Sequence, residues 1–131
     1  MSRTLTGEEA DAALAGAGAF CDALAEKLVT LDGHQGQRLL DAAALTDDGA
    51  RRWAAARAGI AALWTNFATY RDTLELAREV RGAGRADRLG EDERRRLTTL
   101  LRDPVATLDD RPATLDDLAR RLEADHAAVL P

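Results

Sequence analysis

The sequence predicts an all-α protein, an antiparallel four-helix-like bundle of two long helices and two shorter C-terminal helices with a short connector helix. Three observations support this prediction. The 131 residues include 28 Ala and 20 Leu but only five Ile and Val together. Ala and Leu favour helices, whereas strands favour β-branched and aromatic residues. Apolar residues also recur at spacings of three and four, and Gly or Pro residues separate the segments that show this spacing.

The first long helix is expected over residues 7–31. Thr6 and Glu9 have the spacing of a capping box, in which each side chain accepts a hydrogen bond from the backbone of the other residue. Apolar positions then alternate spacings of four and three: Ala10, Leu14, Ala17, Cys21, Leu24, Leu28 and Leu31. Gly33 is placed to end this helix. A short connector helix is expected over residues 35–43.

The second long helix is expected over residues 47–81, after Thr46 as its N-cap and before Gly82 and Gly84. It carries four of the five aromatic residues: Trp53, Trp64, Phe67 and Tyr70. Three of these positions belong to a repeat with spacings of three and four, and Trp64 lies beside it. We therefore expect this helix to be the central element of the core.

Two shorter helices are expected at the C-terminal end, over residues 91–102 and 115–130. Pro104 ends the first of them, and Thr114 with Asp117 resembles a second capping box. The pentapeptide ATLDD occurs at 106–110 and again at 113–117, which we interpret as two successive helix-start signals. The whole chain, 1–131, is expected to be a single helical domain.

The prediction that the long helices are antiparallel has a consequence for their packing. If the first helix ends at Leu31, the small residues 15–18 should lie opposite residues 59–63 of the second helix. Large side chains would then fill the space above Gly16 and Gly18. The two C-terminal helices would cover the remaining flank of the second helix.

Charge is distributed unevenly along the chain. Residues 1–50 carry a net charge of −6, residues 51–102 a net charge of +5 and residues 103–131 a net charge of −4. The strongest local cluster is basic: Arg85, Arg88, Arg94, Arg95 and Arg96. This cluster is interpreted as a solvated surface, as a docking site for an acidic partner or, least favoured, as an anion or nucleic-acid site. A net charge of −5 with a single Lys argues against a nucleic-acid-binding protein.

The sequence offers little support for catalysis or for a bound cofactor. His34 and His126 are far apart, and the Glu residues lack the Glu-x-x-His pairing of di-metal bundles. Cys21 occupies an apolar position of the first helix and is expected to be a small buried side chain. We therefore expect no enzyme, no metal and no cofactor. The lack of a signal peptide and of an 18-residue apolar stretch favours a cytoplasmic location without membrane contact.

Two functions fit these observations. The first is a non-enzymatic helical module for protein–protein interaction or oligomerisation, with a protein partner or a second copy of the chain in a homodimer. It is favoured because repeated apolar spacing occurs without any active-site set. The alternative is a sensor or regulatory domain that binds a small apolar ligand. Its pocket would be lined by Trp53, Trp64, Phe67 and Tyr70, which could equally be the residues that contact a partner.

Overall fold

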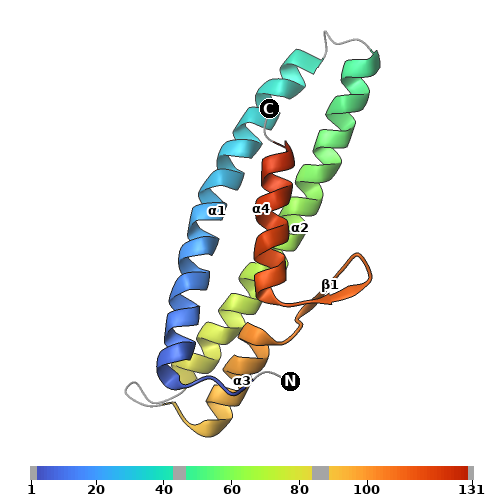
Figure 1. Ribbon diagram of the computed structural model, residues 1–131. Helices are drawn as coiled ribbons and strands as arrows, with labels where there is room; N and C mark the ends of the chain where they lie inside the picture. The colour runs from blue at the N-terminus through green and yellow to red at the C-terminus, as the bar shows by residue number, and fades with distance from the viewer. Residues whose placement is uncertain (1–2, 43–46, 84–88, 130–131) are drawn as a thin grey trace.

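The computed structural model describes residues 3–42, 47–83 and 89–129, and it is mainly helical (Figure 1). The elements in chain order are α1 (Gly7–Ala42), α2 (Asp47–Ala83), α3 (Glu91–Arg102), β1 (Ala106–Leu108), β2 (Arg111–Ala113) and α4 (Leu115–Val129). The predicted all-helical character is confirmed broadly, and one small two-stranded sheet is present in addition. Side chains are described for 3–31, 51, 54–83 and 89–129.

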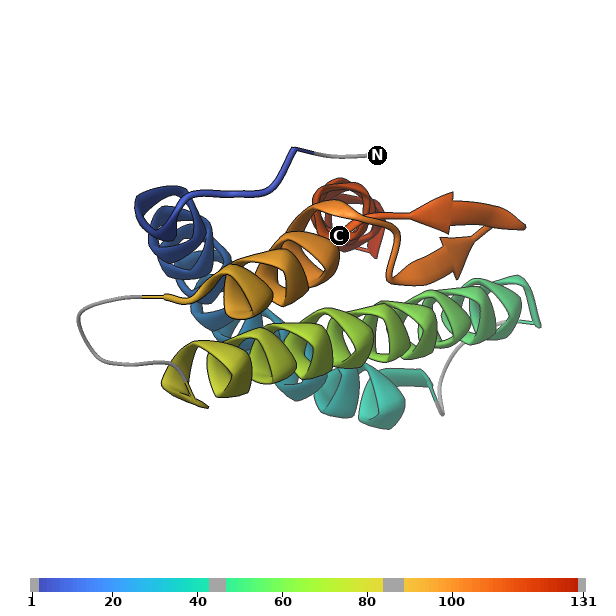
Figure 2. The same ribbon diagram turned by 90° about the horizontal axis from the view of Figure 1, so that it is seen from below.

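The long helices α1 and α2 lie side by side and run in opposite directions (Figure 1). Helices α3 and α4 follow one another along α2, on the side shown at the top of Figure 2. As a result α2 contacts all three other helices, and α3 also contacts α1. Helix α4 ends at the level of Gly59, where an added Cβ would lie 3.2 Å from Cγ1 of Val129. The first three turns of α2 therefore extend beyond α4.

The predicted end of the first helix at Leu31 is wrong. Helix α1 continues without a break to Ala42 and contains 36 residues. The separate connector helix predicted at 35–43 is therefore part of α1. A glycine inside a helix costs about 1 kcal/mol relative to Ala. This penalty at Gly33 is small compared with the stabilisation from the backbone hydrogen bonds of the long helix.

The longer α1 also changes the predicted register between the two long helices. The ring of Phe20 packs against that of Tyr70, with centroids 5.2 Å apart. Gly18 lies against Arg78, because a Cβ at Gly18 would be 2.6 Å from the Nη2 atom of that side chain. The small-residue run around Gly18 therefore does not face residues 59–63, and the predicted partners over it are wrong. The large side chain that lies over Gly18 is that of Arg78, and no atom lies within 4 Å of a Cβ at Gly16.

The core is built from the spacings that the sequence predicted. Buried apolar side chains come from α1 (Ala10, Cys21, Leu24, Leu28, Leu31), α2 (Ile60, Leu63, Phe67, Tyr70, Leu74, Ala77), α3 (Leu97, Leu101) and α4 (Leu115, Leu118, Leu122). The segment before α1 adds Leu5, whose backbone N donates to Oγ1 of Thr98 at 2.8 Å. This hydrogen bond fixes the start of the chain to α3.

Both predicted capping boxes are present. At the start of α1, the backbone N of Glu9 donates to Oγ1 of Thr6 at 3.1 Å, and the backbone N of Thr6 donates to a carboxylate oxygen of Glu9 at 3.2 Å. Thr114 and Asp117 make the same two hydrogen bonds at the start of α4, at 3.0 and 3.2 Å. These contacts form between residues three apart, so the sequence alone could predict them.

The first ATLDD segment forms a hairpin and does not start a helix. Strands β1 and β2 pair antiparallel, with Leu108 opposite Arg111. The two turn residues, Asp109 and Asp110, have positive φ angles of 51° and 65°. This is the left-handed conformation that two-residue hairpin turns require, and Asp tolerates it better than most residues. Strands of three residues are too short to show an alternating pattern, so no sequence signal marks this sheet.

Candidate interaction surfaces

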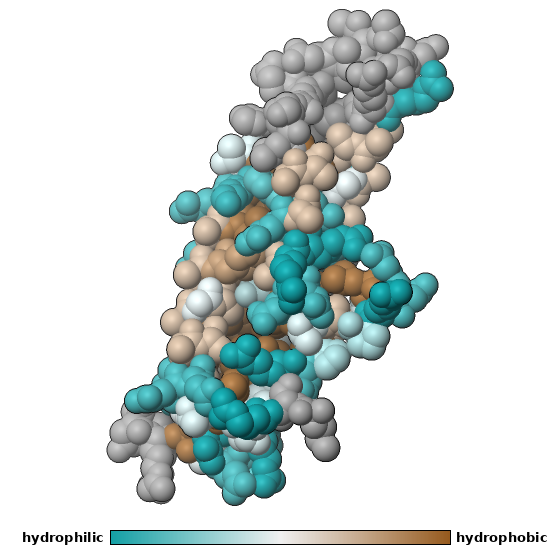
Figure 3. Space-filling model, in the orientation of Figure 1, coloured by the Kyte–Doolittle hydropathy of each residue, from teal (hydrophilic) through white to brown (hydrophobic). Residues whose placement is uncertain are grey.

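Helix α2 has a second face with regular spacing, opposite its buried one. We define the outer face of α2 as Ala54, Ala58, Ala61, Thr65 and Ala68, which are separated by four, three, four and three residues. The first four of these side chains are exposed and Ala68 is partly buried. Figure 3 shows weakly hydrophobic residues over this end of α2. The outer face is therefore apolar, shallow and open to solvent.

The outer face lies in an uncharged stretch with opposite charges at its two ends. Residues 58–70 include no charged residue. Exposed Arg51 and Arg57 precede this stretch. Exposed Asp72, Glu75 and Glu79 follow it and continue the spacing of four and three from Ala68. The charges along this line of the helix thus change from basic to acidic across an apolar centre.

Two further arginines of α2 are turned away from this line. Arg78 lies against Gly18 of α1. The guanidinium of Arg71 lies over the ring of Phe67, 5.8 Å from its centroid, and its Nε atom is 3.6 Å from Asp72. Both side chains extend from the flank of α2 that is nearer α1. Asp72 already has Arg71 as an ion-pair partner, and Glu75 and Glu79 are the other acidic side chains on the line of the outer face.

Helix α1 offers a useful contrast, because it also has an exposed alanine face. Its exposed small residues are Ala12, Ala15, Gly16, Ala19 and Ala23. Weakly hydrophobic residues follow the coloured part of α1 along the left edge of Figure 3. The charged residues beside this face are mainly acidic, with exposed Glu8, Asp22 and Glu26 against Lys27. This face therefore lacks the opposite charges found at the two ends of the outer face of α2.

The aromatic residues that the sequence singled out lie mostly in the core. Phe67 and Tyr70 are 3% and 4% exposed, and Trp64 is partly buried with its ring edge-on to Phe67 at 5.8 Å. Burial raises the pKa of Tyr70 to about 12. The side chain of Trp53 lies outside the described residues. Phe67 and Tyr70 therefore stabilise the core and are not exposed contact residues, and a ligand-binding role for the set stays a prediction.

An open pocket of about 600 Å³ lies at the other end of the molecule, where α1 begins and α2 ends. Its lining residues are Thr6, Gly7, Glu8, Asp11, Arg81, Leu89 and Arg94. The Nε atom of Arg81 donates to Oδ1 of Asp11 at 2.7 Å, which joins the two long helices. Two guanidinium groups and two carboxylates share the lining with apolar atoms, so the pocket is charged in places but has no net charge of either sign.

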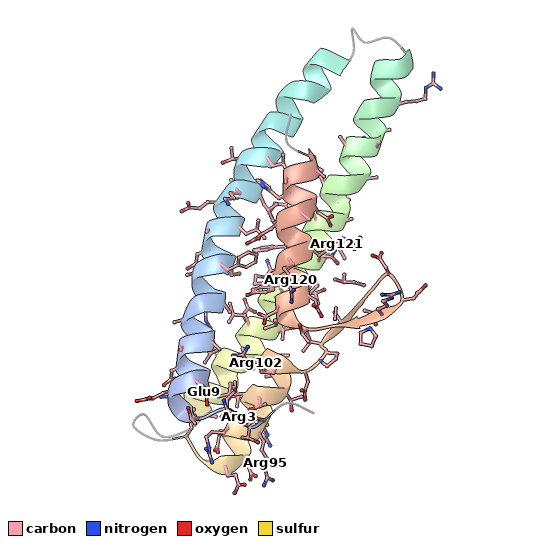
Figure 4. The ribbon with its side chains drawn as sticks, in the orientation of Figure 1. Arg3, Glu9, Arg95, Arg102, Arg120 and Arg121 are labelled. Carbon is pink, nitrogen blue, oxygen red and sulfur yellow. The ribbon has the colours of Figure 1, made fainter. Side chains whose placement is uncertain are left out.

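The structure divides the predicted arginine cluster. Arg94 lines the open pocket, whereas exposed Arg95 pairs with Glu91 one turn earlier at 2.7 Å (Figure 4). Arg96 is exposed, and Arg85 and Arg88 lie outside the described residues. The three consecutive arginines therefore point in different directions around α3. Their role in docking an acidic partner stays a prediction.

A second arginine cluster, which the sequence did not predict, holds the C-terminal elements together. Nη1 of Arg121 donates to Asp109 at 2.6 Å, and Nε of Arg121 donates to Asp125 at 3.2 Å (Figure 4). The hydrogen bond and the charge of Arg121 lower the pKa of Asp109, and this contact connects the hairpin turn to α4. Arg102 of α3 lies 3.8 Å from Asp116 of α4. Only the pair Arg121 and Asp125 has a helical spacing, so the sequence could not reveal the rest.

Comparisons with protein-family models, with curated proteins and with solved structures gave no match to this chain. Among the described residues, no group of three or more His, Cys, Asp and Glu side chains could hold a metal ion. Within the same residues, none of the helices is both long enough and apolar enough to cross a membrane. The inference of function therefore depends on the geometry and charge of the surfaces.

Proposed function

We propose that this protein is a non-enzymatic helical module for protein–protein interaction or oligomerisation, and that the outer face of α2 is its contact surface. The proposal rests on the exposure of this regularly spaced apolar face, although the opposite face of α2 is already buried. Scattered apolar residues are normal on a surface, but a contiguous apolar strip is typical of a contact site. Residues 58–70 supply this strip without a single charge.

The small side chains on this face favour a helix as the partner element. Helix axes pack 8–10 Å apart, depending on the size of the side chains between them. Alanine at four positions of the outer face allows a partner helix to approach at the short end of that range. The buried state of Cys21, the single cysteine, fits a reducing compartment, and we propose the cytoplasm as the location.

The proposed function is tested by absolute mass in solution, measured by light scattering over a series of protein concentrations. We expect a mass above the 14.1 kDa of one chain. Ala61→Glu, which places a charge at the centre of the outer face, should return the protein to the monomer. The matched control is Ala19→Glu on the exposed face of α1, which should leave the assembly intact. A wild-type mass of 14.1 kDa at every concentration would refute oligomerisation.

The open pocket favours a second candidate function, the binding of a small molecule. Its volume of about 600 Å³ is within the usual range for ligand sites. The lining carries charges of both signs, so the suitable ligand is a zwitterion such as a free amino acid, which differs from the apolar ligand of the alternative sequence-based prediction. Arg94 would bind its carboxylate, and Glu8 or Asp11 its ammonium group.

This second candidate is tested by the melting temperature in a concentration series of free amino acids. Binding to the native state should raise Tm with ligand concentration. The increase should disappear in Arg94→Ala and persist in Arg95→Ala, whose side chain does not line the pocket. A Tm that does not change with any of the amino acids would exclude this function.

A further inference from the structure

We infer that the partner at the outer face of α2 is a second copy of this chain, packed antiparallel about a twofold axis near Thr65. This inference rests on the proposed function and adds the identity and the orientation of the partner. Three features of α2 carry it: the order of its charges, their symmetry about Thr65, and the position of its exposed leucine.

The order of charges makes the outer face complementary to itself in one orientation. Arg51 and Arg57 lie at one end, and Asp72, Glu75 and Glu79 lie at the other. In an antiparallel pair each basic end meets the acidic end of the other copy. In a parallel pair like charges would lie opposite one another, which opposes association. Charge complementarity therefore selects both a second copy and the antiparallel arrangement.

The outermost two of these charged residues are symmetric about Thr65. Arg51 and Glu79 are each fourteen residues from Thr65, which corresponds to about 21 Å along a helix. A twofold axis near Thr65 therefore brings Arg51 of each copy opposite Glu79 of the other. The region between the two charged pairs contains the apolar part of the outer face.

The same axis accounts for an exposed large side chain. Leu76 is 51% exposed, although it lies on a helix whose other described leucines are buried. Leu76 and Ala54 are each eleven residues from Thr65. An antiparallel pair places the leucine of each copy over the small alanine of the other.

The exposed face of α1 does not offer the same arrangement. Glu8, Asp22 and Glu26 give it acidic groups towards both ends, with Lys27 as the one basic side chain among the described residues 8–31. A parallel pair of this face would bring like charges together. An antiparallel pair about its centre would place Glu8 of one copy beside both Glu26 and Lys27 of the other, and Asp22 would meet no basic side chain. The acidic excess of the α1 face therefore makes it less complementary to itself than the face of α2.

A cysteine placed near the axis tests the geometry in the full-length protein. In an antiparallel dimer Thr65→Cys brings two thiols together, and we expect a disulfide-linked dimer under mild oxidation. Ala19→Cys, at an equally exposed position on α1, should remain monomeric on a non-reducing gel. Native Cys21 is buried, so it does not compete. If Thr65→Cys gives no more linked dimer than Ala19→Cys, the axis near Thr65 is wrong.

A charge exchange tests the orientation. Arg51→Glu and Glu79→Arg should each weaken the dimer, by about tenfold in its dissociation constant. The double variant R51E/E79R restores both pairs and should recover most of the wild-type affinity. A parallel dimer would show no recovery. If Ala61→Glu separates the dimer but the cysteine and charge tests fail, the antiparallel pairing is overturned while the proposed function stands.

Discussion

The two faces of α2 share one helix and one spacing but have opposite environments. Ile60, Leu63 and Phe67 follow intervals of three and four and are at most 6% exposed. Ala58, Ala61 and Thr65 follow the same intervals and are exposed. Regular spacing places residues on a common face, but it does not say whether that face is buried. Side-chain size makes the difference, because a buried leucine removes far more apolar surface from water than an alanine does.

The first prediction concerns the buried face of α2, where a substitution should cause the largest loss of stability. Leu63 is fully buried, so Leu63→Ala removes its packing and leaves a cavity. We expect the free energy of unfolding to fall by about 3 kcal/mol. The measurement is urea unfolding followed by circular dichroism at one protein concentration.

The control for this prediction is the exposed leucine of the same helix. Measured in the monomeric Ala61→Glu background, Leu76→Ala should lower the free energy of unfolding by less than about 1 kcal/mol, because half of this side chain faces water in the single chain. Equal losses in Leu63→Ala and Leu76→Ala would contradict the assignment of the two faces.

The second prediction concerns Tyr70, the single tyrosine of the chain, on the buried face. Burial raises its pKa from 10.0 to about 12, so the folded state favours the neutral phenol. The corresponding stability is complete below pH 10 and is lost as the pH rises towards 12. The loss is on the order of 2 kcal/mol. Ultraviolet absorbance of the phenolate should show a midpoint well above pH 10.

Unfolding the protein provides the internal reference for this titration. In strong denaturant the midpoint should return to about pH 10, the value of an unperturbed tyrosine. Tyr70→Phe should retain more of its stability between pH 10 and 12 than the wild type does. A folded-state midpoint at pH 10 would show that Tyr70 is not buried from water.

The third prediction uses a helix start, where neither face of α2 is involved. Thr114→Ala removes the Oγ1 atom that accepts the hydrogen bond from the backbone N of Asp117. We expect a loss of about 1 kcal/mol in thermal or urea unfolding. Thr99→Ala, at an exposed position in the last turn of α3, serves as the matched control and should not reduce stability. Equal losses in both variants would argue against the capping box.

The fourth prediction concerns the exposed face of α1 and has the smallest expected effect. A Cβ added at Gly16 would meet no atom within 4 Å, whereas one at Gly18 would meet the guanidinium of Arg78. Gly16→Ala should therefore stabilise the protein by about 0.5 to 1 kcal/mol through its higher helix propensity. Gly18→Ala should gain less, because Arg78 has to move. A gain at Gly18 as large as at Gly16 would contradict the packing of Arg78 across α1.

The interactions that the sequence predicted well are local ones. The capping boxes at Thr6 and Thr114 form between residues three apart, and the buried positions of α1 and α2 follow from helical spacing. The wrong predictions arose where a local sequence signal, such as a glycine or a capping motif, was outweighed by the structure around it. Gly33 is a common stop signal, yet here it lies within α1. The ATLDD pentapeptide starts a helix at 113–117 but forms a strand and turn at 106–110.

The candidate surface was harder to predict than the fold. The sequence draws attention to large aromatic residues, and the structure buries Phe67 and Tyr70. Alanine occurs at both buried and exposed positions of this protein, so nothing in the sequence indicated that Ala54 and Ala61 would be exposed. The change of charge along α2 is visible in the sequence, but its meaning depends on knowing which side of the helix faces solvent.

The sequence by itself determined the helical class, the starts of α1 and α4, and the residues that share each helical face. These features depend on backbone propensity, capping and spacing, which act within a few residues. The tertiary structure alone decided the register of α1 against α2, the hairpin, the contact of Arg121 with Asp109, and which face of α2 stayed exposed. Those features depend on packing between distant segments, where side-chain volume and the position of neighbouring helices set the outcome.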